Sequence, residues 1–401
     1  MSLIVQKFGG SSVANAERIR NVARIVTDAY SAGNQMVVVV SAQGDTTDDL
    51  IAKASEINPR ASKREMDMLL STGEQISIAL LAMCLEGMGY SVKSLTGWQA
   101  GFSTDSNHGG ARIRSINTDR LENELSKNNI VIVAGFQGLN RYDDITTLGR
   151  GGSDTSAVAL AAALHADKCQ IFTDVDGVYT ADPRLVKNAI KLDEISYDEM
   201  LELASLGAQV LHNRSVEMAK KYGVDLEVLS SLERKPGTKV KEVVDVEKLL
   251  IRGVTKDDKS ARVSVVGIPD VPGTAFQLFT LLGKYKINVD VILQSLGQDH
   301  TQEISFTVPM DQLQTTIEVL NDAKETMGFE SVAYNDNISK VSIVGAGMAT
   351  NPGVASKMFG ALYEANINIH MISTSEIKIS VLIDRTDSDK AVVAIHNAFY
   401  A

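Results

Sequence analysis

An internal repeat in the C-terminal part of the chain constrains the fold more than any other feature. Two segments align with a two-residue insertion before the second Pro-Gly: VSVVGIPDVPGTAFQLFTLLGKYKINVDVILQS from Val263 and VSIVGAGMATNPGVASKMFGALYEANINIHMISTS from Val341. Each copy reads as a strand, a Pro-Gly turn, a helix and a strand, followed by another alternating strand and a final helix. The repeat therefore predicts two copies of one βαββαβ, ferredoxin-like module.

The Pro-Gly turns of the two copies indicate a ligand. Pro272-Gly273 and Pro352-Gly353 open the first helix of each copy, and a helix N-terminus suits the carboxylate of a small molecule. Asn288 and Asn368 stand at equivalent positions nearby and could reach the same molecule. A duplicated small-ligand module joined to another domain suggests allosteric control.

Residues 1–230 follow a different pattern, in which apolar strands alternate with helices. The runs MVVVV at 36–40 and IVIVAG at 130–135 are typical of strands buried on both faces, as in a parallel sheet. Further strands are predicted at 3–5, 90–95, 169–173 and 224–229. The charged segment that follows carries Pro236-Gly237 and resembles a boundary. We therefore predict an α/β domain at 1–232, a linker at 233–250, and modules at 251–335 and 336–401.

Composition excludes several classes of protein. The chain has 401 residues, of which 44% are hydrophobic and 22% charged, as expected of a soluble multidomain protein. A net charge of −11 argues against nucleic acid as a partner. The apolar start at 3–5 is too short for a signal sequence and no apolar run approaches a membrane span, so we expect a cytoplasmic protein. Cys84 and Cys169 lie in apolar contexts and are predicted to be buried thiols, without a disulfide framework or a metal motif.

The N-terminus, LIVQKFGGSS, has the layout of a phosphate-binding turn. A glycine pair between a strand and a helix lets backbone N–H groups converge on an anion, and the helix dipole adds to that field. Lys7 would add a full positive charge, and Ser11 and Ser12 could cap the helix or donate to a phosphate. The motif is neither a Walker A loop nor a GxGxxG loop, and taken alone it fits a plain turn equally well.

Three polar positions in the next segments allow two interpretations each. Ser41 ends the run at 36–40 and Thr47 lies in the loop after it, where helix capping and ligand binding at the end of a central strand both explain them. Glu74 opens the nearly apolar segment ISIALLAMCLEGM, in a helical region at 62–88 that breaks at 71–73. Its carboxylate suits either the helix dipole or a cationic group of a ligand.

The stretch TTLGRGGSDTSAV carries the strongest single signal of the α/β half. Glycines at 149, 151 and 152 surround Arg150, and Ser153 and Asp154 follow at the start of a small-residue helix. A solvated loop does not need three glycines around an arginine, whereas the guanidinium fork is the natural partner of a carboxylate. We therefore favour a functional role over a structural turn.

An acidic loop, DVDGVYTADPR, follows the strand predicted at 169–173. Asp174, Asp176, Asp182 and Arg184 share eleven positions with Tyr179, at a spacing that does not match a calcium-binding EF-hand loop. An ordinary acidic turn is one interpretation, and a loop that holds a nucleotide base and its phosphates is the other. His212, further along, is expected to be a helix-end or interface histidine and not a catalyst.

Four motifs in this order resemble the aspartate kinases of the amino acid kinase family. They are KFGGSS at the N-terminus, the LLSTGE run that ends at Glu74, GRGGSD at 149–154 and TDVDGVYTADPR at 173–184. The C-terminal part, with ISTSEIKISVLI at 372–383, is similar to the paired ACT domains of that family. The resemblance covers essentially the whole chain. It implies an amino acid kinase-type αβα sandwich with a mainly parallel sheet, followed by two ACT-like modules.

The resemblance also implies a reaction. The family transfers a phosphoryl group from Mg-ATP to the side-chain carboxylate of L-aspartate, the first step toward lysine, threonine, methionine and diaminopimelate. Lys7 would neutralise the charge of the phosphoryl group during its transfer, and Asp154 would orient Lys7. A general base is not required, because a carboxylate nucleophile is already ionised at neutral pH. Lysine and/or threonine would inhibit at the ACT modules, and pairing of those modules across chains implies a homodimer or a higher oligomer.

The binding residues follow from the same resemblance. The aspartate pocket would contain Thr47, Glu74, Arg150, Gly151, Gly152 and Ser153, with Glu74 on the amino group and Arg150 on a carboxylate. The nucleotide would be held by Lys7, Phe8, Gly9, Gly10, Ser11, Ser41, Thr173, Asp174, Tyr179, Asp182 and Arg184. Effectors would bind Asp270, Ala275, Asn288, Asp290 and Gln294 in the first module, and Val354, Ala355, Asn368, Ile369, Ser375 and Glu376 in the second. No metal ligands from the protein are implied.

Some features leave questions open. Some members of the family carry a lysine at the position of Gln209 that would bind the ATP phosphates. This chain lacks that lysine, so a nucleotide role for position 209 is not implied, and Arg184 would contribute more to phosphate binding. Some relatives make a separate small subunit from an internal start, which here would need a non-Met codon, because no methionine lies between Met218 and Met310. The chain ends directly after the second module, and we expect no fused homoserine dehydrogenase.

Two other functions compete with this one. A sibling kinase that acts on acetylglutamate, glutamate or uridylate would share the KFGG-type turn, but it would lack the ordered set of Glu74, GRGGSD and duplicated ACT modules. A non-catalytic amino-acid sensor would keep the modules on a dead kinase domain. The presence of Lys7, Arg150 and Asp154 argues against the sensor.

Overall fold

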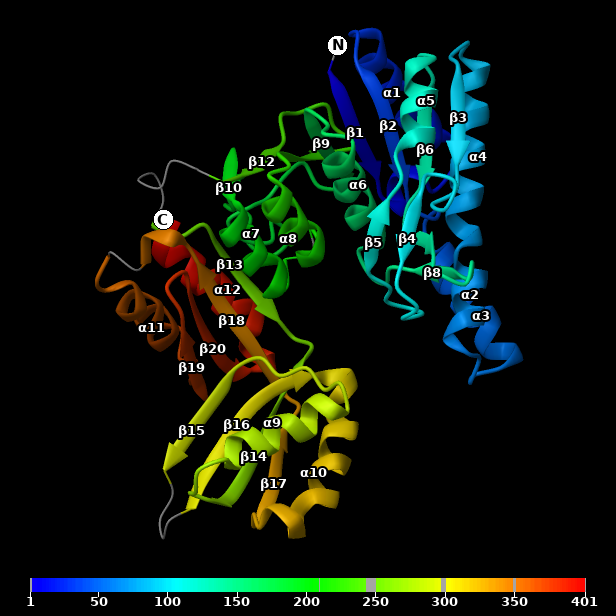
Figure 1. Cartoon of the computed structure of the whole chain (residues 1–401). Coiled ribbons are helices and arrows are strands. Elements are labelled where there is room, and N and C mark those ends of the chain that lie inside the picture. The colour runs from blue at the N-terminus through cyan, green and yellow to red at the C-terminus, as the bar shows by residue number, and fades with distance from the viewer. Residues whose placement is uncertain (1, 209, 243–249, 297–300, 349–350, 401) are drawn as a thin grey trace. The chain divides into compact units, whose positions relative to one another are not determined.

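The computed structural model describes residues 2–208, 210–242, 250–296, 301–348 and 351–400. It divides into two compact units. The first contains Met1–Tyr179 and Ile190–Asp245, and the second contains Thr180–Ala189 and Val246–Ala401. Figure 1 shows the course of the chain, in blue to green through the first unit and in yellow to red through most of the second.

The first unit is built on an eight-stranded sheet with the order β10-β12-β11-β9-β1-β2-β6-β3. All neighbouring pairs in it are parallel except β11 with β12, so the predicted mainly parallel sheet is confirmed. The strands span Leu3–Phe8 (β1), Gln35–Val40 (β2), Val92–Leu95 (β3), Ile130–Ala134 (β6), Lys168–Thr173 (β9), Glu194–Ser196 (β10), Leu226–Ser230 (β11) and Thr238–Lys241 (β12).

Helices cover both faces of this sheet. Ile4 and Phe8 of β1 pack in one core with α1 (Ala16–Ser31) and α4 (Thr72–Gly87). Side chains alternate along a strand, so Lys7 points to the opposite face, where α6 (Gly152–Ala163) packs against β1, β2 and β9. The other helices of the unit are α2 (Thr46–Ile57), α3 (Lys63–Leu70), α5 (Asp119–Ser126), α7 (Tyr197–Ser205) and α8 (Asn213–Tyr222). The predicted αβα sandwich is therefore confirmed.

The start of α1 differs from the prediction. Gly10–Val13 form a 3-10 turn, and α1 begins at Ala16 with Asn15 as its cap, whose side chain accepts from the Arg18 N–H at 3.0 Å. The prediction that Ser11 or Ser12 caps the helix is therefore wrong. Ser12 is buried instead, with its hydroxyl 2.8 Å from that of Ser231. The apolar periodicity cannot separate a short 3-10 turn from the first turn of an α-helix, which explains the error.

The helical stretch 63–87 contains α3, a turn at Ser71 and α4, as predicted. By length and composition it could cross a membrane. However, Ile78, Leu81, Ala82 and Leu85 lie in the core beneath the sheet, together with α1. Such burial is typical of the central helix of a globular domain.

A second, smaller sheet of the first unit was not predicted. It has the order β5-β4-β7-β8, from strands Phe102–Thr104 (β4), Ile113–Ile116 (β5), Gln137–Leu139 (β7) and Ile145–Thr147 (β8). These strands have only three or four residues each, too few for a periodic pattern to stand out. The last of them leads directly into the Gly149–Gly152 turn.

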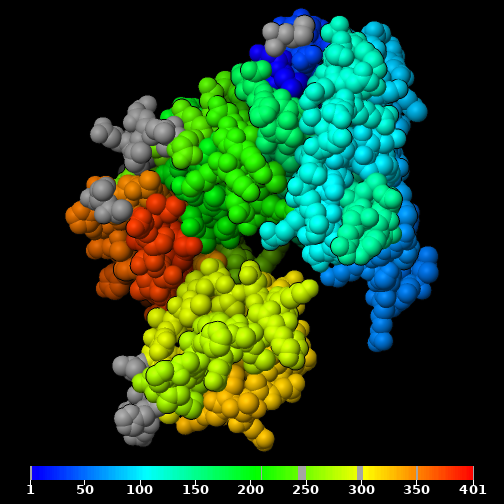
Figure 2. All heavy atoms as spheres, in the orientation of Figure 1, coloured from blue at the N-terminus to red at the C-terminus, as the bar shows by residue number. Residues whose placement is uncertain are grey.

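The second unit contains both predicted ferredoxin-like modules; the first has the predicted βαββαβ order, and the second has the order βαββα. The first has β14 (Ser260–Pro269), α9 (Thr274–Lys284), β15 (Ile292–Leu296), β16 (Thr301–Pro309), α10 (Leu313–Met327) and β17 (Ser331–Asn335), in an antiparallel sheet with the order β15-β16-β14-β17. In Figure 2 its side chains, in yellow to light orange, form one compact block.

The second module draws one strand from an earlier part of the chain. It has β18 (Ile338–Val344), α11 (Val354–Glu364), β19 (Met371–Thr374), β20 (Lys378–Asp384) and α12 (Ser388–Tyr400). Its fourth strand is β13 (Gly253–Asp257), which pairs antiparallel with β18. The boundary predicted at 251 assigns these five residues to the first module. The prediction missed this assignment because it depends on the pairing of β13 with β18, which is distant in the chain. A local pattern of five residues cannot show such a pairing.

The segment 180–189, predicted within the 1–232 domain, belongs to the second unit. Ala181 and Val186 are buried in the core of the second module. The Thr180 carbonyl accepts from the Val254 N–H at 2.8 Å. The chain therefore leaves the kinase-type unit for ten residues and returns to it at Ile190.

Candidate functional site

Lys7 and Asp154 form a buried ion pair. β1 presents Lys7 toward α6, and Asp154 lies in the first turn of that helix. The Lys7 Nζ and Asp154 Oδ1 atoms are 2.6 Å apart, and the two side chains are 11% and 12% exposed. The two residues predicted to be catalytic are 147 positions apart in sequence, and the fold brings them into contact.

The glycine pair after β1 is packed against the loop that follows β2. A Cβ added at Gly10 would lie 2.7 Å from the Ala42 carbonyl oxygen, so no other residue fits there without movement. The Gly10 carbonyl accepts from the Gly44 N–H at 3.0 Å, which fixes the turn. A Cβ at Gly9 would stand 3.5 Å from the Lys7 Nζ, so the glycine backbone lies next to the ammonium group.

The turn at 149–152 holds Arg150 out from the start of α6. Gly149 and Gly151 have φ angles of 78° and 69°, in the left-handed region that favours glycine. Arg150 is exposed, and within the described residues its guanidinium has no hydrogen bond or ion pair. A cationic fork is thus held by specialised backbone while its donors stay available for a ligand.

Two clusters that sequence reasoning missed support this turn. Asp67 of α3 is fully buried and accepts from the Thr147 hydroxyl at 2.6 Å, the Gly109 N–H at 3.0 Å and the His108 ring at 2.9 Å. On the other side, the Arg214 guanidinium donates to the Leu148 carbonyl at 2.9 Å and the Ala111 carbonyl at 2.8 Å. In the sequence, Asp67 resembles any surface acid of an amphipathic helix, because the strands that bury it are distant in the chain.

Glu74 is a buried carboxylate whose two oxygens have different surroundings. It is 3% exposed at the start of α4, and its Oε1 accepts from the Ala42 N–H at 3.1 Å. Its Oε2 is buried and has no hydrogen-bond partner within the described residues. Burial raises the pKa of Glu74 to about 7, against the opposing effect of backbone N–H groups. A buried carboxylate oxygen without a partner in the described residues can accept a hydrogen bond from a cationic group of a ligand.

The remaining predicted pocket residues lie at the carboxyl ends of neighbouring strands and at helix starts. Ser41 follows β2 and donates its N–H to the Phe8 carbonyl at 3.1 Å. Thr47 is half-buried in the first turn of α2. Ser153 is buried, and a Cβ at Gly135 after β6 would lie 2.7 Å from its hydroxyl oxygen. This edge of a parallel sheet is where α/β proteins bind ligands.

The end of β9 adjoins the N-terminal turn. Phe172 and Phe8 stack with ring centroids 4.6 Å apart, and the Gly9 N–H donates to the Phe172 carbonyl at 3.3 Å. Thr173 follows, with its hydroxyl accepting from the Val175 N–H at 3.0 Å. Asp174 is exposed. Two predicted nucleotide residues, Phe8 and Thr173, are therefore close to the phosphate-type turn.

Tyr179, Asp182 and Arg184 are engaged in local polar contacts. The Tyr179 hydroxyl donates to Asp176 at 2.7 Å, which raises the pKa of Tyr179 to about 12. Arg184 forms an ion pair with Asp182 at 2.7 Å, in the segment that belongs to the second unit. Gln209 lies outside the described residues.

The predicted effector residues lie in the two modules, and some of them adjoin the N-termini of two equivalent helices. Gly273 and Gly353 are the N-caps of α9 and α11, with φ angles of 99° and 97°, which confirms that the Pro-Gly turns open these helices. Next to these caps in sequence lie Asp270 and Ala275 in the first module, and Val354 and Ala355 in the second. Asn288, Asn368 and Ile369 instead follow the C-terminal ends of α9 and α11, and Ser375 and Glu376 are exposed after β19.

Two predicted effector residues of the first module already have partners. Asp290 forms an ion pair with Lys340 of β18, whose side chain is 3% exposed. Gln294 donates its side-chain amide to Gln302. In this structure Asp290 therefore joins the first module to the second.

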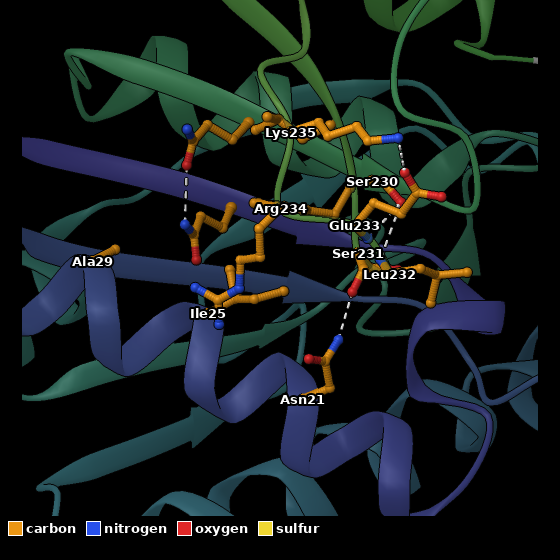
Figure 3. A pocket seen from close by; sticks show the side chains of 13 residues that line it. Asn21, Ile25, Ala29, Ser230, Ser231, Leu232, Glu233, Arg234 and Lys235 are labelled. Atoms are coloured by element: carbon orange, nitrogen blue, oxygen red, sulfur yellow. Dashed lines mark hydrogen bonds and ion pairs between the residues drawn. The ribbon is translucent and has the colours of Figure 1, made fainter.

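A pocket of about 360 Å³ lies on the opposite face of the eight-stranded sheet from Lys7. Figure 3 shows Asn21 and Ile25 of α1 on one side and Ser230–Lys235 on the other, with Asn21 donating to the Ser231 carbonyl. Lys7, Glu74 and Arg150 do not line it. This pocket is therefore separate from the candidate site.

Comparison with known proteins supports the resemblance. The model of the amino acid kinase family matches residues 2–230, and that of the ACT domain matches residues 263–323 and 341–399. The chain is 52% identical over 400 residues to an aspartokinase of Bacillus sp. (strain MGA3) and 53% identical over 400 residues to aspartokinase 2 of Bacillus subtilis. These matches cover 100% of this chain and 97% and 98% of those relatives.

Two solved structures of an aspartokinase are similar to this chain over its whole length. The chain superposes on E. coli aspartokinase III in complex with aspartate and ADP (R-state) with a TM-score of 0.86 and 25% identity, covering 100% of both chains. The same enzyme in complex with lysine and aspartate (T-state) gives a TM-score of 0.75, with the same identity and coverage.

Proposed function

The chain belongs to the amino acid kinase family, among its ACT-containing aspartokinases, and on that premise we propose that it phosphorylates the side-chain carboxylate of L-aspartate with ATP. The product is 4-phospho-L-aspartate, which leads to lysine, threonine, methionine and diaminopimelate. The observation that carries this proposal is the buried Lys7–Asp154 pair at the start of α6, next to the turn that holds Arg150.

The chemistry requires two anions to meet. A side-chain carboxylate oxygen of aspartate forms a bond to the γ-phosphorus as the bond from that phosphorus to the bridging oxygen breaks, and ADP leaves. The protein itself forms no covalent bond in this reaction, so alignment and charge neutralisation supply most of the catalysis. Lys7 neutralises the phosphoryl group, and Asp154 orients Lys7. The backbone of Gly9, Gly10 and Ser11 cradles the phosphate, since Gly9 lies next to the Lys7 ammonium group.

Mg²⁺ accompanies ATP in this proposal and neutralises part of its phosphate charge. Within the described residues no group of three or more His, Cys, Asp and Glu side chains is placed to hold a metal ion. Phosphate oxygens and water would therefore supply most of its ligands, as is usual for Mg²⁺ at nucleotide sites.

Each end of aspartate has a complementary group in the site. The guanidinium of Arg150 clamps a carboxylate, and the Oε2 of Glu74, which has no partner in the described part of the chain, accepts from the substrate ammonium group. Ser153 and Thr47, with the backbone of Gly151 and Gly152, complete the pocket. For the nucleotide we propose Phe8, Ser41, Thr173, Asp174, Tyr179, Asp182 and Arg184.

The raised pKa of Glu74 predicts how aspartate binding depends on pH. Below about pH 7 the Glu74 carboxyl is increasingly protonated in the free enzyme, and a neutral carboxyl cannot pair with an ammonium group. The KM for aspartate should therefore rise about tenfold from pH 8 to pH 6, with kcat nearly constant. Glu74→Gln should give a high KM that no longer changes over this range. A flat KM in the wild type, measured by initial rates, would contradict the assignment.

Loss of the Asp67 carboxylate is predicted to impair aspartate binding from a distance. Asp67→Asn weakens the charge-assisted bonds to Thr147, Gly109 and His108, so the 149–152 turn is held less firmly. We expect the KM for aspartate to rise roughly tenfold while the KM for ATP stays unchanged. Glu56→Gln, at an exposed position of α2, is a matched control. Equal changes in both KM values would show a general loss of structure instead.

The second unit is proposed to bind the inhibitors. Lysine and/or threonine would place a carboxylate at the N-termini of α9 and α11, beside the predicted effector residues. β15 and β19 are edge strands of their sheets and expose Ile292, Leu293 and Ile372. Exposed apolar edge strands favour pairing with another chain, so we propose a homodimer or higher oligomer through these modules. We also propose that the protein is cytoplasmic.

One assay separates this function from its competitors. Initial rates of ADP release are measured with Mg-ATP and aspartate, glutamate, acetylglutamate or uridylate, and then with aspartate plus lysine, threonine or both. We expect activity with aspartate alone among the acceptors, and inhibition by at least one effector. Activity with another acceptor would indicate a sibling kinase, and no activity would indicate an amino-acid sensor.

A further inference from the structure

His212 plays no part in the functions assigned above, yet it contacts the turn that carries Arg150. It is the N-cap residue of α8 and is half-buried. A Cβ added at Gly151 would lie 2.2 Å from His212 Cγ and 2.5 Å from Cδ2, so the imidazole edge covers the Gly151 α-carbon. Gly151 is the N-cap of α6, three residues before Asp154, so the ring lies at the start of the helix whose first turn carries Asp154.

The capping bond selects the tautomer of this imidazole. The Arg214 N–H is shared between Asn213 Oδ1 at 2.8 Å and His212 Nδ1 at 3.3 Å. With Nδ1 as an acceptor, it carries a lone pair and the proton of the neutral ring is on Nε2. Burial lowers the pKa of His212, and the Asp154 carboxylate opposes that effect. Within the described residues Nε2 has no hydrogen-bond partner. The ring therefore offers a neutral N–H donor next to the site.

We infer that the His212 Nε2–H donates to an oxygen of the γ-phosphoryl group, which makes His212 a further catalytic residue of the reaction proposed above. In the proposed function, Arg150 and Glu74 match the charged ends of aspartate and Lys7 meets the phosphoryl group. Asp154, the partner of Lys7, lies in the first turn of α6, whose N-cap Gly151 is covered by the ring. A neutral donor adds a hydrogen bond there without the cost of burying another charge. Its position on the α8 cap, which Arg214 also secures through the Leu148 and Ala111 carbonyls, fixes its geometry.

Two substitutions separate this role from capping. His212→Asn keeps a side-chain acceptor near the Nδ1 position, where asparagine is a preferred cap, but removes the distal N–H. His212→Gln restores an amide N–H near the Nε2 position and loses the short capping acceptor. A purely structural residue would tolerate asparagine better than glutamine, whereas a phosphate donor would tolerate glutamine better than asparagine.

The experiment measures nucleotide binding by calorimetry with ADP and with a non-hydrolysable ATP analogue, together with initial rates. For His212→Asn we expect analogue affinity and kcat/KM for ATP to fall about 10- to 100-fold, with ADP affinity, the KM for aspartate and the melting temperature unchanged. His212→Gln should recover part of the loss.

Three results would overturn the inference: unchanged analogue affinity in His212→Asn, an equal loss for ADP and the analogue, or a change confined to the KM for aspartate. The binding arm uses no aspartate, so it tests His212 independently. If the wild-type enzyme failed to phosphorylate aspartate, the proposed function would fail while the binding result would still decide the contact to the γ-phosphate.

Discussion

Lys7→Met is expected to abolish aspartate-dependent ADP release, lowering kcat roughly 10³-fold or more. The side chain keeps its length and loses the only charge that β1 brings to the start of α6. Negative charge spreads over the phosphoryl oxygens as the group moves, and the loss of a single preorganised donor at such a site already costs about 10²- to 10³-fold. The measurement is the coupled release of ADP at saturating aspartate and ATP.

A second variant is needed because this substitution also affects stability. Without Lys7, the Asp154 carboxylate is left about nine-tenths buried and unpaired, which costs on the order of 3 kcal/mol in comparable buried pairs. Lys7→Met/Asp154→Asn removes both charges and should recover most of the melting temperature without recovering activity. If the double variant regained near wild-type kcat, Lys7 would have a structural role only.

Arg150→Ala is expected to raise the KM for aspartate about 100-fold or more while leaving the KM for ATP unchanged. The guanidinium has no hydrogen bond or ion pair within the described residues, so its removal should not destabilise the fold. Each charge-assisted hydrogen bond to a carboxylate contributes about 1.5–3 kcal/mol, and the fork makes two of them. Arg150→Lys keeps the charge but loses the fork, and should raise the KM about tenfold or more.

The matched control for Arg150 is Arg141→Ala. Arg141 is also exposed on the first unit, where its guanidinium stacks over the Tyr142 ring at 4.6 Å. Its loss should leave both KM values within error of the wild type. An Arg150→Ala enzyme with a wild-type KM for aspartate would show that another group binds the substrate carboxylate.

Local features of the chain were the most predictable. The run at 36–40 became β2, with five consecutive buried valine or methionine residues, because a strand covered on both faces is apolar at every position. The Pro-Gly turns likewise became the N-caps of α9 and α11, since a left-handed glycine before a helix is a local requirement. These patterns depend on neighbouring residues only, so a single sequence shows them.

Long-range contacts escaped prediction. β13 completes the sheet of the second module across the whole of the first, and its five residues carry no sign of that partner. Asp67 is buried by residues that lie 41 to 80 positions later, His108, Gly109 and Thr147. Glu74 lies between these cases: its sequence pattern allowed a helix-dipole or a ligand role, the family resemblance favoured the ligand role, and the buried oxygen without a partner in the described residues supports it.

In the candidate site, too, residues that lie in local motifs were predicted, whereas contacts between distant segments were not. The contact between Lys7 and Asp154 was expected because each lies in a motif of special backbone that resembles a known family. His212 was expected to be a helix-end residue, which is correct, since it caps α8. Its contact with Gly151 depends on the packing of α8 against α6, which no local pattern reveals.

The most direct test of the account identifies the product. An acyl phosphate reacts with hydroxylamine to give a hydroxamate, so the enzyme is incubated with Mg-ATP, L-aspartate and hydroxylamine, and aspartyl hydroxamate and ADP are measured together. We predict that the wild type forms both at equal rates and that Lys7→Met forms neither. ADP release without hydroxamate, or hydroxamate formed from another acceptor but not from aspartate, would contradict the proposed function.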